Sequence, residues 1–212
     1  MIALDTVTLR GEGRSILDRV TFTFGPGIWH LAAAPSRDAR LVLHLLAGQC
    51  APAGGDLRCR GARSWLLGQF APFGVHLRGL DIIDTLCSLY ALERRGTFRL
   101  FHDLLEQPQW LTVRFDRWPQ IPRRQFGHIA FIAPAFDNYL LDVSPVLAQP
   151  EFYRRWRTLF DTRIVGKTAI IVSGEHRAAL RDFPGERLTL SEGRLHPARD
   201  ATAALPPAMA AE

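Results

Sequence analysis

Residues 30–48, HLAAAPSRDARLVLHLLAG, have the outline of a strand, a tight turn and a helix. The apolar run 28–34 is typical of a buried strand, and the polar residues 35–38 that follow it are typical of a turn. The next apolar residues recur at helical spacing, at Leu41, Val42, Leu45 and Leu46. We therefore predict a strand over 28–34 and a helix over 38–47, which Gly48 ends.

Loops that bind phosphate share this layout, and their pattern is GxxxxGK[ST]. Its glycines let backbone N–H groups wrap the phosphate, its lysine reaches the β- and γ-phosphates, and its Ser or Thr holds Mg²⁺. Counted back from the Leu-Leu-Ala-Gly end, the glycines fall on Ala33 and Asp38, the lysine on Ala39 and the Ser/Thr on Arg40. A carboxylate at Asp38 would repel phosphates. The layout is therefore present without the residues that carry its chemistry.

The composition is that of an ordinary globular chain. Its 212 residues suit one α/β domain, and the mean hydropathy is -0.01. No apolar run reaches the length of a membrane span and no basic-then-apolar leader follows Met1, so we expect a cytosolic protein. The cysteines lack metal-ligand spacing and cannot all pair, so no disulfide framework is expected; they are Cys50, Cys59 and Cys87.

The charge is basic, with a net value of +5 and a pI of about 9.7. Almost all basic residues are arginines, and Lys167 is the only lysine. The arginines are scattered among acids, and the pairs Arg123–Arg124 and Arg154–Arg155 are too short for a nucleic-acid patch. We therefore predict no nucleic-acid partner.

The rest of the chain alternates between strands and helices. Strands are predicted over 2–9, 20–24, 57–60, 64–68, 138–142, 168–173 and 187–190. Helices are predicted over 80–92, 98–105, 123–132, 151–160 and 176–181, with an irregular stretch over 110–122. In the helix over 80–92, the candidates for the buried face are Ile82, Ile83, Leu86, Leu89 and Tyr90.

This order predicts a single α/β domain over 1–196. The first strands suggest a small antiparallel sheet, and strands separated by helices indicate a parallel sheet with helices on both faces. Residues 80–122 interrupt the alternation and are interpreted as a helical insert. The Ala- and Pro-rich residues 197–212 are predicted to form a disordered tail.

Three blocks of sequence point to a known protein family. Each block alone is a weak signal, but their order and spacing together are specific. They are SWLLGQFAPFGVHLRGLDIIDTLCSLYALE (64–93), AFDNYLLDVSPVLAQPEFYRRW (135–156) and TAIIVSGEHRAALRDFPGERLTLSEGRL (168–195). Together they resemble the nucleotide-binding subunits of ABC transporters. Within these they resemble the branch that energises capsular polysaccharide export, with relatives in O-antigen and teichoic acid export. The resemblance covers residues 2–195.

The resemblance implies a P-loop NTPase, ABC ATPase-like three-layer core with a small antiparallel β lobe and a helical insert. It implies a membrane permease or an intact ABC ATPase subunit as partner, or a second copy of this chain. The chain would then be cytoplasmic and peripheral, at the inner face of the cytoplasmic membrane. Trp65, Phe70 and Phe73 resemble the groove that receives the transporter's coupling helix, and Gln69 lies near the family's glutamine-bearing loop. For Trp65, core packing is an equal explanation.

The family's Walker A and signature residues are replaced here. The Walker A lysine and Ser/Thr fall on Ala39 and Arg40. The signature Ser-Gly, which should meet the partner's γ-phosphate at a helix N-terminus, falls near Gln120–Ile121. Paired with an intact subunit, this chain would leave one composite site without Walker A and the other without a signature.

Of the family's motifs that follow the signature, only the Walker B aspartate is kept. The Walker B aspartate is kept as Asp142, but the general-base glutamate after it is Val143. The aspartate of the following loop falls near Gln149. The switch histidine falls on Gly174, with His176 two residues further on.

These losses predict a chain that does not hydrolyse ATP and needs no cofactor. Phosphoryl transfer depends on Lys, Mg²⁺ and a base or water-positioning group, and losing one such group commonly costs orders of magnitude in rate. The leading interpretation is a degenerate structural or regulatory subunit of a polysaccharide exporter. A second is an ATPase whose rebuilt site holds ATP and Mg²⁺ through Ser36, Arg37, Arg40, Gln69, Asp142 and His176. A third is an ABC-fold binding module unrelated to transport.

Overall fold

The computed structural model describes residues 1–67, 74, 76–142, 150–172 and 182–197. Four predicted site residues lie outside these ranges: Gln69, Phe70, Phe73 and His176. The predicted helix over 176–181 and the tail from residue 198 onward lie outside them as well.

Two sheets are present in the described ranges. An antiparallel sheet has the order β2-β1-β4 and contains β1 (Ile2–Gly11), β2 (Arg14–Phe24) and β4 (Gly54–Cys59). The second sheet has the order β5-β6-β7-β3-β8-β9. Its strands are β3 (Gly27–Ala33), β5 (Arg63–Leu67), β6 (Asn138–Asp142), β7 (Thr168–Val172), β8 (Glu186–Ser191) and β9 (Arg194–Pro197). Neighbours from β5 to β8 pair in parallel, and β9 is antiparallel to β8.

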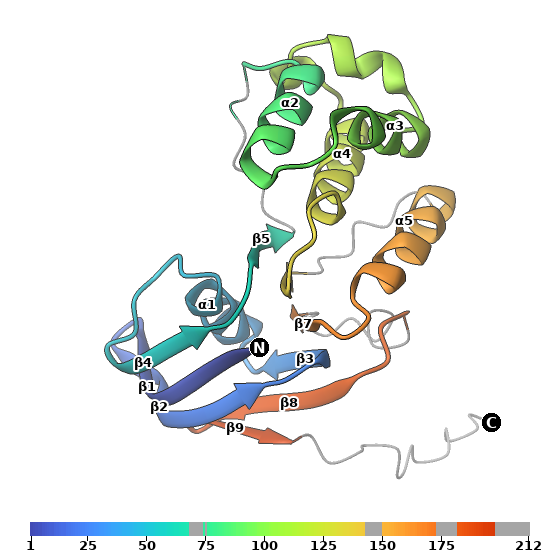
Figure 1. The fold of residues 1–212 in the computed structure, drawn as a ribbon. Coiled ribbons are helices and arrows are strands. Elements are labelled where there is room, and N and C mark those ends of the chain that lie inside the picture. Colours follow the sequence, from blue (N-terminus) through green and yellow to red (C-terminus); the bar gives the residue numbers. More distant parts are fainter. Residues whose placement is uncertain (68–73, 75, 143–149, 173–181, 198–212) are drawn as a thin grey trace, which may run out of the picture.

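The helices divide between the two ends of the molecule. They are α1 (Ser36–Leu46), α2 (Gly79–Tyr90), α3 (Arg94–Leu104), α4 (Gln120–Ile132) and α5 (Pro150–Arg163), with 3₁₀ turns at Pro108–Thr112 and Phe115–Arg117. Figure 1 shows α1 among the strands at one end and α2, α3 and α4 gathered at the other, with α5 between them. The α/β class and the antiparallel lobe predicted from the sequence are confirmed.

Two boundaries in the helical part differ from prediction for local reasons. Helix α2 ends at Tyr90 because Ala91 adopts a left-handed conformation with φ of 51°. Helix α3 then begins at Arg94, earlier than predicted, because Glu93 accepts hydrogen bonds from the backbone N–H groups of Arg95 and Gly96. The carboxylate cap supplies the start signal that apolar spacing alone does not show.

Helix α4 begins at Gln120, inside the stretch predicted to be irregular. Pro119 is its N-cap and Pro122 lies in its first turn. Backbone N–H groups in the first turn have no helical partner, so a proline there breaks no hydrogen bond. The two prolines start this helix rather than prevent it.

The strand predictions need three main corrections. Strand β2 begins at Arg14 rather than at 20, because its residues from Arg14 onward pair with β1. Strand β4 begins at Gly54 rather than at 57, because Gly54 pairs with Thr8 of β1. Strand β9 follows the strand predicted over 187–190 and pairs with it, so that strand is not the last one. Strand β6 has the predicted bounds.

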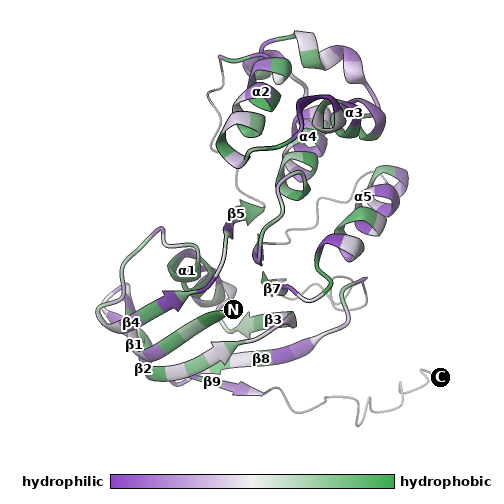
Figure 2. Cartoon of the chain, in the orientation of Figure 1, coloured by the Kyte–Doolittle hydropathy of each residue, from purple (hydrophilic) through white to green (hydrophobic). Residues whose placement is uncertain are grey.

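Two hydrophobic cores lie on opposite faces of the parallel sheet. Leu140 and Ile170 pack into the core formed with α1 and the antiparallel sheet, whereas Tyr139 and Ile171 pack into the core formed with the helical part. Strands buried on both faces are expected to be continuously apolar, as these are. Figure 2 shows β7 hydrophobic at the centre and α3 strongly hydrophilic at the outer end.

One face of α2 was wrongly assigned from the sequence. Ile82, Ile83 and Leu86 are buried as predicted, but Leu89 is 69% exposed and Tyr90 is 39% exposed. The last turn of α2 therefore presents apolar side chains to the surface. The spacing of apolar residues predicts which face of a helix is buried, but it does not show how far along the helix the neighbouring elements extend.

Candidate functional site

The connection between β3 and α1 consists of Ala34 and Pro35 alone. The predicted turn over 35–38 is wrong, because Ser36 to Asp38 form the first turn of α1. A phosphate-binding loop needs a longer glycine-containing segment whose successive N–H groups surround the phosphate. Here Pro35 has no N–H, and the N–H of Asp38 donates to the carbonyl of Pro35 at 3.1 Å. The position of the phosphate-binding loop is thus filled by a short, closed connection.

Asp38 is held by an arginine from the antiparallel sheet. Its two carboxylate oxygens each accept a hydrogen bond of 2.7 Å from Nη2 of Arg14, the first residue of β2. The Asp38 side chain is 8% exposed and the Arg14 side chain 46%. A carboxylate in the first turn of a helix also interacts favourably with the helix dipole. The group that would repel phosphate is therefore a buried structural anchor.

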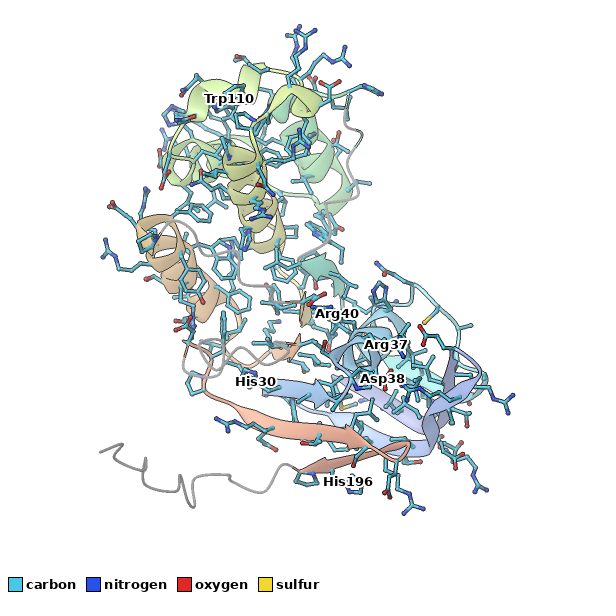
Figure 3. All side chains as sticks on the ribbon, turned by 180° about the vertical axis from the view of Figure 1, so that it is seen from behind. His30, Arg37, Asp38, Arg40, Trp110 and His196 are labelled. Atoms are coloured by element: carbon cyan, nitrogen blue, oxygen red, sulfur yellow. The ribbon has the colours of Figure 1, made fainter. Side chains whose placement is uncertain are left out.

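The two arginines considered as phosphate ligands are also paired with carboxylates. Arg37 lies 2.8 Å from Glu12 in an exposed pair. Nε of Arg40 lies 3.1 Å from Oδ2 of Asp142, the last residue of β6. Figure 3 shows Arg37, Asp38 and Arg40 on α1. The fold thus brings the predicted residues Arg40 and Asp142 together, while Arg37 pairs elsewhere.

The remaining residues at the predicted Walker A and signature positions lie at the starts of α1 and α4. Ser36 is the half-buried first residue of α1, and the methyl group of Ala39 is buried in the core beside it. Gln120 and Ile121 open α4, so the signature position does lie at a helix N-terminus. No side chain caps that end, and Ile121 is exposed. In the predicted alignment Ile121 thus places a large apolar side chain at the position of the signature glycine.

Trp65 belongs to an aromatic cluster in the second core. Its ring makes edge contacts with Phe131 and Phe136, at centroid distances of 6.2 and 5.6 Å, and lies 6.1 Å from Tyr90. The side chain is half-buried, which agrees with the packing explanation. The exposed residue beside it is Tyr90, and Leu89, the preceding residue of α2, is exposed as well. The sequence did not single out either as a surface residue.

His30 is a buried polar residue to which the sequence assigned no role. Its Nε2 lies 2.5 Å from the carbonyl oxygen of Phe183, so Nε2 carries the proton and donates. Its Nδ1 is buried and has no hydrogen-bond partner among the described residues. Burial lowers the pKa of His30, the hydrogen bond to Phe183 opposes this shift, and the charge of Arg187 adds to it. The ring is therefore held neutral in the middle of β3, against the backbone of Phe183.

The fold is that of the ATP-binding subunits of ABC transporters. A solved structure described as an ATP binding subunit of an ABC transporter superimposes with a TM-score of 0.72. It matches 92% of this chain and 88% of its own, at 13% sequence identity.

A sequence relative points in the same direction. Over 160 residues the chain is 22% identical to the capsule polysaccharide export ATP-binding protein CtrD of Neisseria meningitidis serogroup B (strain MC58). The match spans 75% of this chain and 73% of CtrD. No family model matches the chain. The similarity supports the ABC ATPase family.

Two features are absent from the described ranges. No helix there is long and apolar enough to cross a membrane. No group of three or more His, Cys, Asp or Glu residues there is arranged to hold a metal ion.

Replacing Arg14 should destabilise the protein through Asp38. In Arg14→Ala the carboxylate of Asp38 stays in a mostly buried place without its partner, which we expect to cost about 1–3 kcal/mol in the free energy of unfolding. Arg37→Ala is the matched control, because an exposed pair contributes about 0–1 kcal/mol. Urea unfolding measures both. Equal, small effects of the two substitutions would show that the Asp38 pair anchors nothing.

Acid should destabilise the fold through His30. Below the ordinary histidine pKa of about 6.5, the unfolded chain binds a proton that the buried ring does not, so the free energy of unfolding falls as pH drops from 7 toward 5. We expect His30→Leu to lose part of this fall. The exposed His196 on β9 gives the control His196→Leu, which should keep it. Urea unfolding at several pH values makes the comparison, and identical slopes for all three proteins would contradict it.

Proposed function

We propose that this chain is an ABC-type subunit that does not hydrolyse ATP and acts as a structural or regulatory component of a polysaccharide exporter. The observation that carries the proposal is the closed β3–α1 connection, sealed by the pair between Arg14 and Asp38. A subunit built this way keeps the shape of an ATPase and offers a buried acid where phosphate would bind. The polysaccharide-export role rests on the similarity to CtrD.

The electrostatics at the start of α1 favour this function over a rebuilt ATPase. A rebuilt site needs free cationic groups to neutralise phosphate charge. Both Arg37 and Arg40 are already paired with carboxylates, and Asp38 adds a negative charge in the first turn. Nucleotide would have to displace these acids before it could bind.

Docking on a membrane permease, or on an intact ATPase subunit, follows from the proposal. The surface we assign to it is the end of α2, where Leu89 and Tyr90 are exposed and the Tyr90 ring lies near Trp65. Apolar side chains gathered on a surface are commonly covered by a partner. This would place the chain at the cytoplasmic face of the membrane, held there by its partner.

Calorimetric titration with ATP tests the loss of activity. We expect no saturable heat with or without Mg²⁺, and phosphate release at the rate of buffer alone, because Arg37 and Arg40 are already paired with carboxylates. Arg40→Ala serves as the comparison. Micromolar binding that disappears in Arg40→Ala would establish the rebuilt ATPase instead.

Co-purification with a permease tests the docking role. The tagged chain is extracted in mild detergent from cells that carry the permease encoded beside its gene, and we expect the two to purify together. Leu89→Asp should reduce the recovered permease several-fold by placing a charge in the apolar contact. Val165→Asp, at an exposed apolar position after α5, is the matched control. Undiminished recovery with Leu89→Asp would exclude this surface, and no recovery at all with the unaltered chain would favour a module unrelated to transport.

A further inference from the structure

The ion pair between Arg40 and Asp142 joins α1 to the end of β6. Nε of Arg40 lies 3.1 Å from Oδ2 and 3.3 Å from Oδ1 of Asp142, so it contacts both carboxylate oxygens. The Asp142 side chain is 19% exposed and the Arg40 side chain 44%. The two residues are separated by 102 positions in the sequence. The contact is therefore a product of the fold, and it spans the edge of the sheet where the parallel strands end.

These two positions have a defined chemistry in P-loop NTPases. The Ser or Thr of the loop and the aspartate at the end of the Walker B strand hold Mg²⁺ between them. By position, Arg40 replaces the Ser/Thr, and Asp142 is the aspartate. In this chain the two side chains meet directly.

We propose that the guanidinium of Arg40 takes the place of the divalent cation, so that α1 and β6 are bridged permanently by the chain itself. This inference rests on the proposed function. It adds that the contact between Arg40 and Asp142 holds together the place where an ATPase would bind Mg²⁺. A guanidinium donates to carboxylate oxygens and carries the positive charge that Asp142 requires. Since Arg40 is always protonated, the bridge needs neither metal nor nucleotide.

The same contact opposes the binding of a metal ion at Asp142. A divalent cation there would meet the positive charge of Arg40 a few ångströms away, and it would find a cation where P-loop NTPases supply a hydroxyl ligand. The bridge that depends on bound nucleotide and Mg²⁺ in an ATPase is thus constitutive here. Such a subunit would offer a partner one fixed arrangement of α1 and β6.

A double-mutant cycle tests the bridge. Arg40→Gln and Asp142→Asn should each lower the melting temperature by about 2–4 °C, the shift expected for a chain of this size on losing one such contact. The double variant should lose no more than the larger single loss, because the contact is already gone. The exchanged pair Arg40→Asp with Asp142→Arg, measured as a further double variant, should recover part of the loss. Strictly additive losses with no recovery on exchange would overturn the proposal.

A metal titration gives an independent readout. At constant ionic strength, replacing NaCl by about 10 mM MgCl₂ should shift the melting temperatures of the unaltered chain and of Asp142→Asn equally, because a cation stabilises the fold specifically only where the folded chain binds it. A stabilisation by Mg²⁺ that Asp142→Asn abolishes would make Asp142 an open metal ligand and overturn the proposal. The two proposals can fail separately. ATP hydrolysis by the unaltered chain would refute the proposed function, whereas additive losses without hydrolysis would refute the bridge alone.

Discussion

Strand β3 is the constraint on which the rest of the structure depends. It pairs in parallel with β7 on one side and β8 on the other, and its two faces separate the two hydrophobic cores. Leu31 faces the core shared with α1, whereas the buried His30 contacts Phe183 of the other core. Because both cores close on this strand, its carboxyl end and the start of α1 are rigidly placed. The chemistry of that edge is then decided by whichever side chains are aimed at it.

At that edge, arginine–carboxylate pairs stand where an ATPase would hold phosphate and metal. Arg14 and Arg40 come from different elements, and each is matched with an acid from another part of the chain. A pair with one mostly buried partner is costly to break, since the remaining charge loses its solvation and its partner. The arrangement is self-neutralising, which makes it a poor site for a polyanion and a good clamp between elements. It fits the proposed function, in which the chain keeps the shape of an ABC subunit without hydrolysing ATP.

Much of the fold was predictable, and the failures have local causes. Strand β7 and the apolar centre of β6 were identified because strands buried on both faces have a recognisable apolar pattern. The start of α3 was misplaced because its signal is the carboxylate of Glu93, and the start of α4 because prolines in a first turn look like helix breakers. Leu89 and Tyr90 were assigned to the buried face because periodicity reports an apolar stripe and not how far the covering elements extend.

The sequence by itself determined the α/β class and the succession of a strand near 28–34 and a helix near 38–47, because these depend on residue order and short-range periodicity. Only the tertiary structure decided which charges meet at the start of that helix. Asp38 and Arg14 are 24 positions apart, and Arg40 and Asp142 are 102 apart. Ion pairs form where the packing of the sheet and α1 brings charges within a few ångströms, and no local pattern encodes that distance.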